Sequence, residues 1–190
     1  MIPSPLSGHG LVVLGIDPGL RATGWAVLAM TGPDEASFRR EELSVLAYGA
    51  VQTETGAALP ERLRCIARGL REVIERWQPA EAAVEEAFVA ANKRVAIAIG
   101  QARGVALLAA AEADMPVFEY SASEVKQAVA GYGRGSKEQV QEMLRLQLGL
   151  EAAPQPADAA DALATALCHV VRRRVEALMA GADVSPGEKT

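Results

Sequence analysis

The sequence predicts an α/β fold built on a mixed five-stranded sheet with helices on both faces. Residues 11–52 contain three apolar runs with strand spacing, joined by short links. From residue 59 onward, segments with helical spacing alternate with two short apolar runs, which gives the order βββαβαβααα. Elements in this order pack as helices against the faces of one sheet.

The first three strands are predicted to form an antiparallel meander. We expect them at Leu11–Asp17, Gly24–Met30 and Leu43–Gln52. The polar segment Gly32–Glu42 is short enough to be the hairpin loop before the third strand.

Helices and strands alternate in the middle of the chain. Apolar residues recur at every third or fourth position from Leu59 to Trp77, which is typical of an amphipathic helix. AEAAVEEAF supplies a strand that ends near Glu85, and PVFEY supplies the next one. Between them, the alanine-rich segment Asn92–Ala113 predicts a long helix.

Two glycines in that long helix, Gly100 and Gly104, lower its stability. They predict close packing, either against the sheet or against a second copy of the chain.

The C-terminal third has three predicted helices. Ser121-x-x-Glu124 and Ser136-x-x-Gln139 are capping-box patterns that open the first two, with the loop GYGRG between them. The last helix begins near Asp158. Residues 1–10 are predicted to be a flexible leader, residues 11–174 the folded domain and residues 175–190 a tail.

Composition excludes several classes of site. The chain has 190 residues, a formal net charge of −5, two cysteines and two histidines. The cysteines form no C-x-x-C pair, and a zinc site or a Ser-His-Asp triad would have to rest on His9 or His169. If a metal is used, its ligands are mostly carboxylates, which select Mg²⁺ or Mn²⁺. No signal peptide or membrane span is expected, so we predict a cytoplasmic protein.

Four acidic residues stand out because apolar or small residues surround them: Asp17, Glu85, Asp158 and Asp161. Asp17 and Glu85 end two strands that become neighbours if the fourth strand pairs in parallel with the first. The other two are three residues apart at a helix start, and therefore on one face. Individually, Asp158 is a good N-cap, Asp17 a good turn initiator and Glu85 a plausible solvated strand end. A shared Mg²⁺ site would explain all four together.

Four separated blocks of this sequence closely resemble the RuvC family of bacterial Holliday-junction resolvases. They are IDPGLRATGWAV, VEEAFVAANKRVAIAIGQARGVAL, VFEYSASEVKQAVAGYGRGSKEQV and PADAADALATAL, and the resemblance covers about residues 11–171. It implies an RNase H-like fold and a homodimer that nicks two opposed strands of four-way junction DNA, leaving 5′-phosphate and 3′-hydroxyl ends. It also implies the branch-migration proteins RuvA and RuvB as partners.

The resemblance assigns roles to individual residues. Asp17, Glu85, Asp158 and Asp161 take the places of the four catalytic carboxylates, which hold two Mg²⁺ ions, with Mn²⁺ as a substitute. Lys137 matches a basic residue near the phosphate and is included in the catalytic set. The residues expected to contact DNA are Lys137, Lys126, Phe88, Tyr132 and Arg134, with Phe88 stacking on a base.

Other interpretations stay open from the sequence alone. Phe88 would also suit packing under its loop, and Lys126 would suit an exposed, solubilising position. An RNase H-like nuclease that acts on RNA or simple duplex is one alternative function. A junction-binding module without catalysis is another, although the intact acid set argues against it. An actin-like ATPase would need two copies of this fold, and the chain is long enough for one.

Overall fold

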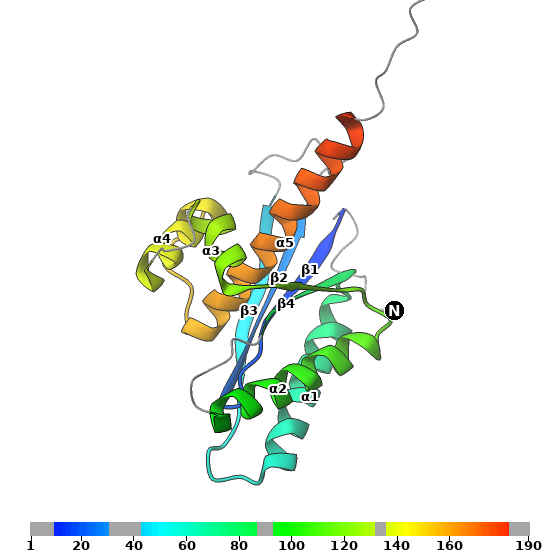
Figure 1. Ribbon diagram of the computed structural model, residues 1–190, viewed down its shortest axis with the longest axis vertical. Coiled ribbons are helices and arrows are strands. Elements are labelled where there is room, and N and C mark those ends of the chain that lie inside the picture. Colours follow the sequence, from blue (N-terminus) through cyan, green and yellow to red (C-terminus); the bar gives the residue numbers. More distant parts are fainter. Residues whose placement is uncertain (1–9, 31–42, 87–92, 132–135, 183–190) are drawn as a thin grey trace, which may run out of the picture.

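The computed structural model describes residues 10–30, 43–86, 93–131 and 136–182. Within them, one five-stranded sheet is covered by helices on both faces (Figure 1). The predicted element order βββαβαβααα is confirmed. The predicted loop Gly32–Glu42 lies outside the described residues.

The sheet has the strand order β3-β2-β1-β4-β5. Its first three strands pair antiparallel, as the meander predicts, whereas β4 pairs in parallel with β1, and β5 in parallel with β4. The strands are β1 (Val12–Asp17), β2 (Ala22–Met30), β3 (Leu43–Gln52), β4 (Glu81–Glu85) and β5 (Val117–Tyr120). The central position of β1 explains its unbroken apolar run, because both of its faces are buried.

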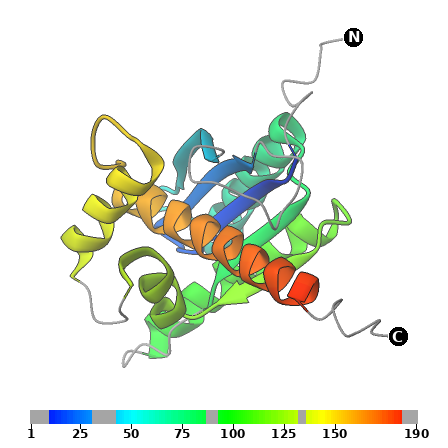
Figure 2. The same cartoon turned by 90° about the horizontal axis from the view of Figure 1, so that it is seen from above.

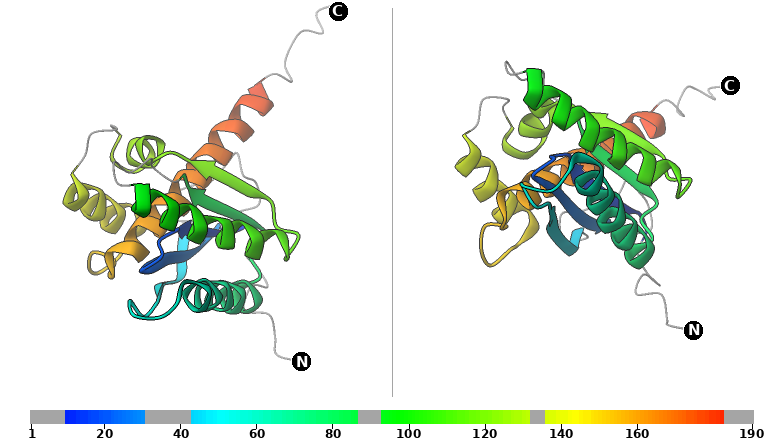
Figure 3. Two further views of the ribbon diagram at one scale, coloured as in Figure 1. Left: turned by 60° about the horizontal axis from the view of Figure 1, so that its bottom comes forward. Right: turned by 90° about the horizontal axis from the view of Figure 1, so that it is seen from below.

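Two separate cores lie on the two faces of the sheet. Along β1 the side chains alternate between them: Val13 joins one core, and Leu14 and Ile16 join the other. Helix α5 (Ala157–Ala182) covers the first face, and α1 (Leu59–Trp77) and α2 (Lys93–Ala111) cover the second (Figures 2 and 3).

Helices α3 (Ala122–Ala130) and α4 (Lys137–Leu148) flank the start of α5. Both predicted capping boxes are present, since Ser121 and Ser136 each accept from the backbone of the residue three positions on. The boxes fix where α3 and α4 begin, and hence where the side chains of their first turns lie.

Of the two kinds of close packing predicted for Gly100 and Gly104, packing against the sheet is wrong. A Cβ added at either glycine would meet nothing within 4 Å, so neither packs against the sheet. The alanines on the opposite face of α2 make that contact instead: Ala102, Ala106, Ala109 and Ala110.

Helix α2 is, by length and mean hydropathy, the one described helix that would be able to cross a membrane. It packs against α1 and β5 here, and its buried alanines belong to the core. Val95, Ile97 and Leu108 are exposed on it, Ile97 at 61%.

Helix α5 continues past Arg174 to Ala182, so part of the segment assigned to a tail is helical. It extends beyond the sheet, and exposed apolar side chains follow its last turns, among them Val175, Leu178 and Met179.

Candidate active site

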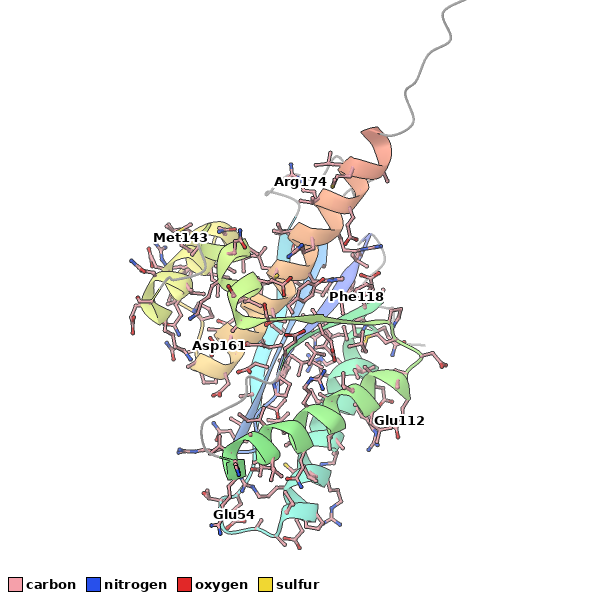
Figure 4. All side chains as sticks on the ribbon, viewed as in Figure 1. Glu54, Glu112, Phe118, Met143, Asp161 and Arg174 are labelled. Atoms are coloured by element: carbon pink, nitrogen blue, oxygen red, sulfur yellow. The ribbon has the colours of Figure 1, made fainter. Side chains whose placement is uncertain are left out.

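The carboxyl ends of β1 and β4 carry the first two predicted acids. The parallel pairing of Ile16 with Val84 places Asp17 and Glu85 at the same edge of the sheet, as predicted. Helix α5 begins beside this edge, with Asp158 in its first turn and Asp161 three residues on (Figure 4). Three elements that are distant in sequence thus bring acidic residues to one end of the sheet.

Two glycines allow α5 to lie this close to the sheet. A Cβ on Gly24, which pairs with Asp17 across the ladder, would come within 1.9 Å of the backbone oxygen of Asp158. A Cβ on Gly15 would be 2.1 Å from the backbone oxygen of Ala162. Only hydrogen fits at either position, so these glycines set the distance between the strand-borne and helix-borne acids.

A cavity of about 270 Å³ opens at this edge. Asp17, Glu85 and Asp161 line it together with Lys126 and Lys137, so five predicted site residues meet around one space. Apolar side chains from α3, α4 and α5 complete the wall: Ala122, Val125, Val140 and Ala164.

Asp158 faces an adjoining groove of about 810 Å³ instead. Arg21, Thr53 and Arg62 also line this groove, with Val95, Ala98 and Ile99 of α2 on its far side. Asp158 is still close enough to the cavity for its charge to raise the pKa of Asp17.

The pKa values of the two half-buried acids are strongly raised. Burial, followed by the charges of Glu85, Asp161 and Asp158, raises the pKa of Asp17 to about 7. Burial and Asp161 likewise raise the pKa of Glu85 to about 7. Within the described part of the chain, neither carboxylate has a hydrogen bond or an ion pair. The ionised forms of both acids are therefore disfavoured, and a bound cation would stabilise them.

Lys137 supplies positive charge at the cavity. Its Nζ donates to Oδ2 of Asp161 at 2.7 Å, and this hydrogen bond raises the pKa of the lysine. Its charge also lowers the pKa of both Asp17 and Glu85. A lysine in the first turn of a helix opposes the helix dipole. The acidic cavity compensates for that unfavourable position.

The donor set at this edge consists of carboxylate oxygens, the ligands that Mg²⁺ and Mn²⁺ prefer. Among the described residues, no group of three or more His, Cys, Asp or Glu is already arranged to hold a metal ion. The acids fit a divalent ion by chemistry and by their shared location, and side-chain rotation would be needed to bring their oxygens onto one ion.

Three predicted DNA contacts, Phe88, Tyr132 and Arg134, lie outside the described residues. Arg21 and Arg62 line the groove but were not among the predicted site residues. Arg62 donates from Nε to the Thr53 hydroxyl at 2.9 Å and from Nη2 to the Leu20 carbonyl at 3.1 Å. It thereby ties α1 to the turn that follows Asp17. The position of Arg21 near the site could have been predicted from the sequence, because it lies only four residues after Asp17.

Comparison with known proteins places the chain in a family. The family model described as "Crossover junction endodeoxyribonuclease RuvC" matches residues 13–169, most of the chain. The chain belongs to the RuvC family. This confirms the resemblance that the four sequence blocks carry.

Curated relatives in the RuvC family align over most of their own length. The chain is 53% identical over 156 residues to the crossover junction endodeoxyribonuclease RuvC of Chloroflexus aggregans, covering 82% of this chain and 90% of the relative. It is 46% identical over 166 residues to the protein of the same name from Rubrobacter xylanophilus, covering 87% and 88% respectively.

Solved structures agree with the fold. T. thermophilus RuvC in complex with Holliday junction substrate is 39% identical, with a TM-score of 0.79 over 88% of this chain and 98% of that one. The yeast mitochondrial Holliday junction resolvase Ydc2, at 11% identity, has a TM-score of 0.59 over 97% of this chain and 90% of its own, which supports the fold alone. The predicted RNase H-like α/β fold is confirmed.

Proposed function

We propose that this RuvC-family chain is a divalent-metal-dependent endonuclease that resolves four-way DNA junctions by paired symmetric nicks during recombination and repair. The convergence of the four acids at one edge of the sheet carries the proposal. Half-buried Asp17 and Glu85 at the strand ends line one cavity with Asp161, and Asp158 lies in the same helix turn as Asp161 and lines a neighbouring groove. The products would be 5′-phosphate and 3′-hydroxyl ends.

The four carboxylates would hold two Mg²⁺ ions, with Mn²⁺ as a substitute. When bound, such ions activate a water and stabilise the leaving oxygen. The chain's own contribution is a rigid frame, because Asp17 and Glu85 sit on paired central strands and the other two acids on a helix packed against them. The low-dielectric wall formed by Val125 and Val140 strengthens electrostatic interactions inside the cavity.

Lys137 would stabilise the negative charge that develops on the scissile phosphate. Its ammonium forms an ion pair with Asp161 at 2.7 Å, so it lies next to one of the acids that would hold the metal. Lys126 lines the same cavity and would bind a flanking phosphate. Both lysines belong to elements whose starts are fixed by capping boxes, which keeps them directed at the site.

DNA would leave the cavity along the groove beyond Asp158. Arg21 is exposed there, and no described residue accepts a hydrogen bond from its side chain, so its guanidinium is available to a backbone phosphate. Phe88, Tyr132 and Arg134 would make the remaining contacts, with Phe88 stacking on an unpaired base.

The active unit would be a homodimer, because a four-way junction offers two equivalent cleavage positions related by a two-fold axis. The open face of α2 suits the dimer interface: Gly100 and Gly104 leave its backbone accessible beside exposed Ile97 and Leu108. RuvA and RuvB would be partners in the cytoplasm, on the basis of the family alone.

Cleavage of synthetic substrates tests this proposal. Wild type and Asp17→Asn are incubated with four-way junctions, linear duplex and RNA·DNA hybrid in Mg²⁺. We expect wild type to nick only the junction, symmetrically, and Asp17→Asn to bind it without nicking. Equal cleavage of linear duplex or hybrid would support a general RNase H-like nuclease instead. Junction binding without any cleavage by wild type would support a non-catalytic module.

A further inference from the structure

His169, which no part of the proposed chemistry uses, is fully buried in α5 and has a hydrogen-bond partner at each ring nitrogen. Its Nε2 lies 2.6 Å from Oε2 of Glu81, and its Nδ1 lies 2.7 Å from the hydroxyl of Tyr120. The second oxygen of Glu81 lies 3.4 Å from the Arg173 guanidinium. The ring of Phe118 packs against the imidazole with a centroid distance of 4.6 Å.

The chemistry of the partners fixes the protonation of this network. A carboxylate can only accept, so Nε2 of His169 carries the hydrogen and donates to Glu81. Burial lowers the pKa of His169 although Glu81 opposes that shift, so the ring is neutral and Nδ1 accepts from Tyr120. Burial also raises the pKa of Tyr120, which keeps the hydroxyl proton in place as the donor.

The network joins β4 and α5, two of the three elements that carry the acids, with β5. Glu81 begins β4, and Glu85 ends it. Tyr120 pairs with Glu85 across the sheet, and its carbonyl accepts from the backbone of Glu86 at 2.8 Å. His169 lies eight residues beyond Asp161 on α5, about 12 Å along a straight helix. Figure 4 shows Asp161 at the start of α5 and Phe118 on β5.

The remaining contact between α5 and the sheet gives little directional control. It is apolar: Ala162 and Ala166 approach Gly15, and Leu163, Leu167 and Val170 are buried in the core beside them. Apolar packing of this kind brings the helix close to the sheet, but the hydrophobic effect itself is non-directional. Hydrogen bonds are directional, and a fully satisfied buried network specifies one arrangement.

We propose that Tyr120, His169 and Glu81 are positioning residues, which hold α5 in register with β4 and β5 and thereby set the place of Asp158 and Asp161 relative to Glu85. They touch neither DNA nor metal. This inference rests on the proposed nuclease function. Because metal catalysis is sensitive to displacements of about 1 Å, loss of the network should reduce the rate more than it weakens junction binding.

The test compares His169→Leu and Tyr120→Phe with Val170→Ala, which removes buried volume from the next residue of α5 but none of the network's hydrogen-bonding groups. We expect His169→Leu to lower the single-turnover cleavage rate at saturating junction by about tenfold or more. Tyr120→Phe should lower it less, and junction Kd should stay within about twofold for both. Val170→Ala should lower only Tm.

Mn²⁺ binding to the DNA-free protein, followed by calorimetry, gives a second readout. Weaker Mn²⁺ binding in His169→Leu and Tyr120→Phe, with wild-type binding in Val170→Ala, would support positioning even if wild type cleaved no junction and the proposed function failed. If both network variants kept wild-type cleavage and Mn²⁺ affinity while Tm fell, the network would be purely structural and the inference wrong. Should His169→Leu fail to fold, Tyr120→Phe decides, because it removes one hydroxyl only.

Discussion

At the scale of single residues, Asp17 shows how the site opposes the stability of the fold. An ionised carboxylate at the end of a central strand, surrounded by three further acids, is unfavourable without a counter-ion. Its raised pKa of about 7, against 3.8 ordinarily, expresses that penalty. Lys137 offsets only part of it. The ionised side chain of Asp17 therefore lowers the stability of the fold, and a bound metal would remove this cost.

The pH dependence of stability follows from this shift. An acid with a raised folded pKa binds its proton more tightly in the folded state, so its favourable contribution is complete below pH 3.8 and is lost as pH rises to about 7. Without divalent metal, we expect Asp17→Asn to raise the free energy of unfolding at pH 8 by about 1–3 kcal/mol. Denaturant unfolding at pH 5 and pH 8 measures it.

Addition of Mg²⁺ is the control for that measurement. It should raise the free energy of unfolding of wild type at pH 8 and leave that of Asp17→Asn nearly unchanged. The difference between the two proteins should therefore become smaller. A variant less stable than wild type at pH 8 in EDTA would contradict the buried-charge explanation.

Lys137 carries a second prediction at this scale. Lys137→Met removes the charge that lowers the pKa of Asp17 and Glu85, so both acids stay protonated to higher pH. We expect the cleavage rate to fall by about 10²–10³-fold. The Mg²⁺ concentration for half-maximal rate near pH 7 should also rise. Lys137→Arg, which keeps the charge, should recover part of the rate, and a Met variant with an unchanged Mg²⁺ requirement would refute the electrostatic argument.

At the scale of elements, the contact between α5 and the sheet decides whether the acids meet. Gly24 lies where β2 passes under the first turn of α5, and an added methyl group would overlap the Asp158 backbone. The overlap involves backbone atoms rather than a flexible side chain, so the helix start itself would have to move. Asp158 and Asp161 would move with it.

Gly24→Ala tests that geometry. We expect it to lower the free energy of unfolding by about 1–3 kcal/mol, as overpacking of a core does. Junction cleavage should fall by at least about tenfold, because two of the four acids are displaced. Gly56→Ala makes the same chemical change in open space and should behave as wild type. Tm and single-turnover rates measure both effects, and a Gly24→Ala variant as active as wild type would show that α5 tolerates displacement.

The sequence was sufficient to predict the elements and the meeting of the acids, because hydrophobic spacing and capping boxes are local signals. Parallel pairing of β4 with β1 then follows from topology and brings Glu85 to Asp17. The His169 network was not predictable, since its three members come from elements whose relative rotation no local pattern encodes. The role of Arg62 was not predictable either, because its contacts with Thr53 and Leu20 are long-range and an arginine on a helix is usually a solvated charge.

At the scale of the whole molecule, one face of α2 packs in the core and the other is exposed. Its alanine face completes the core, whereas Gly100 and Gly104 meet no other part of the described chain. Their exposure on a helix with Ile97 and Leu108 leaves an apolar surface that an isolated protomer would keep in water. A two-fold pairing of α2 helices would cover this surface and leave both active-site cavities free.

Ile97→Asp tests this assembly, because Ile97 is 61% exposed and its replacement leaves the protomer core unchanged. We expect the variant to elute as a monomer with a wild-type Tm at low protein concentration, since a buried charge opposes association. Leu146→Asp, on an exposed position of α4, should remain dimeric. A monomeric Ile97→Asp protein should lose paired nicking of four-way junctions, because two linked active sites are needed for both cuts. A dimeric Ile97→Asp protein with paired nicking would place the interface elsewhere on the molecule.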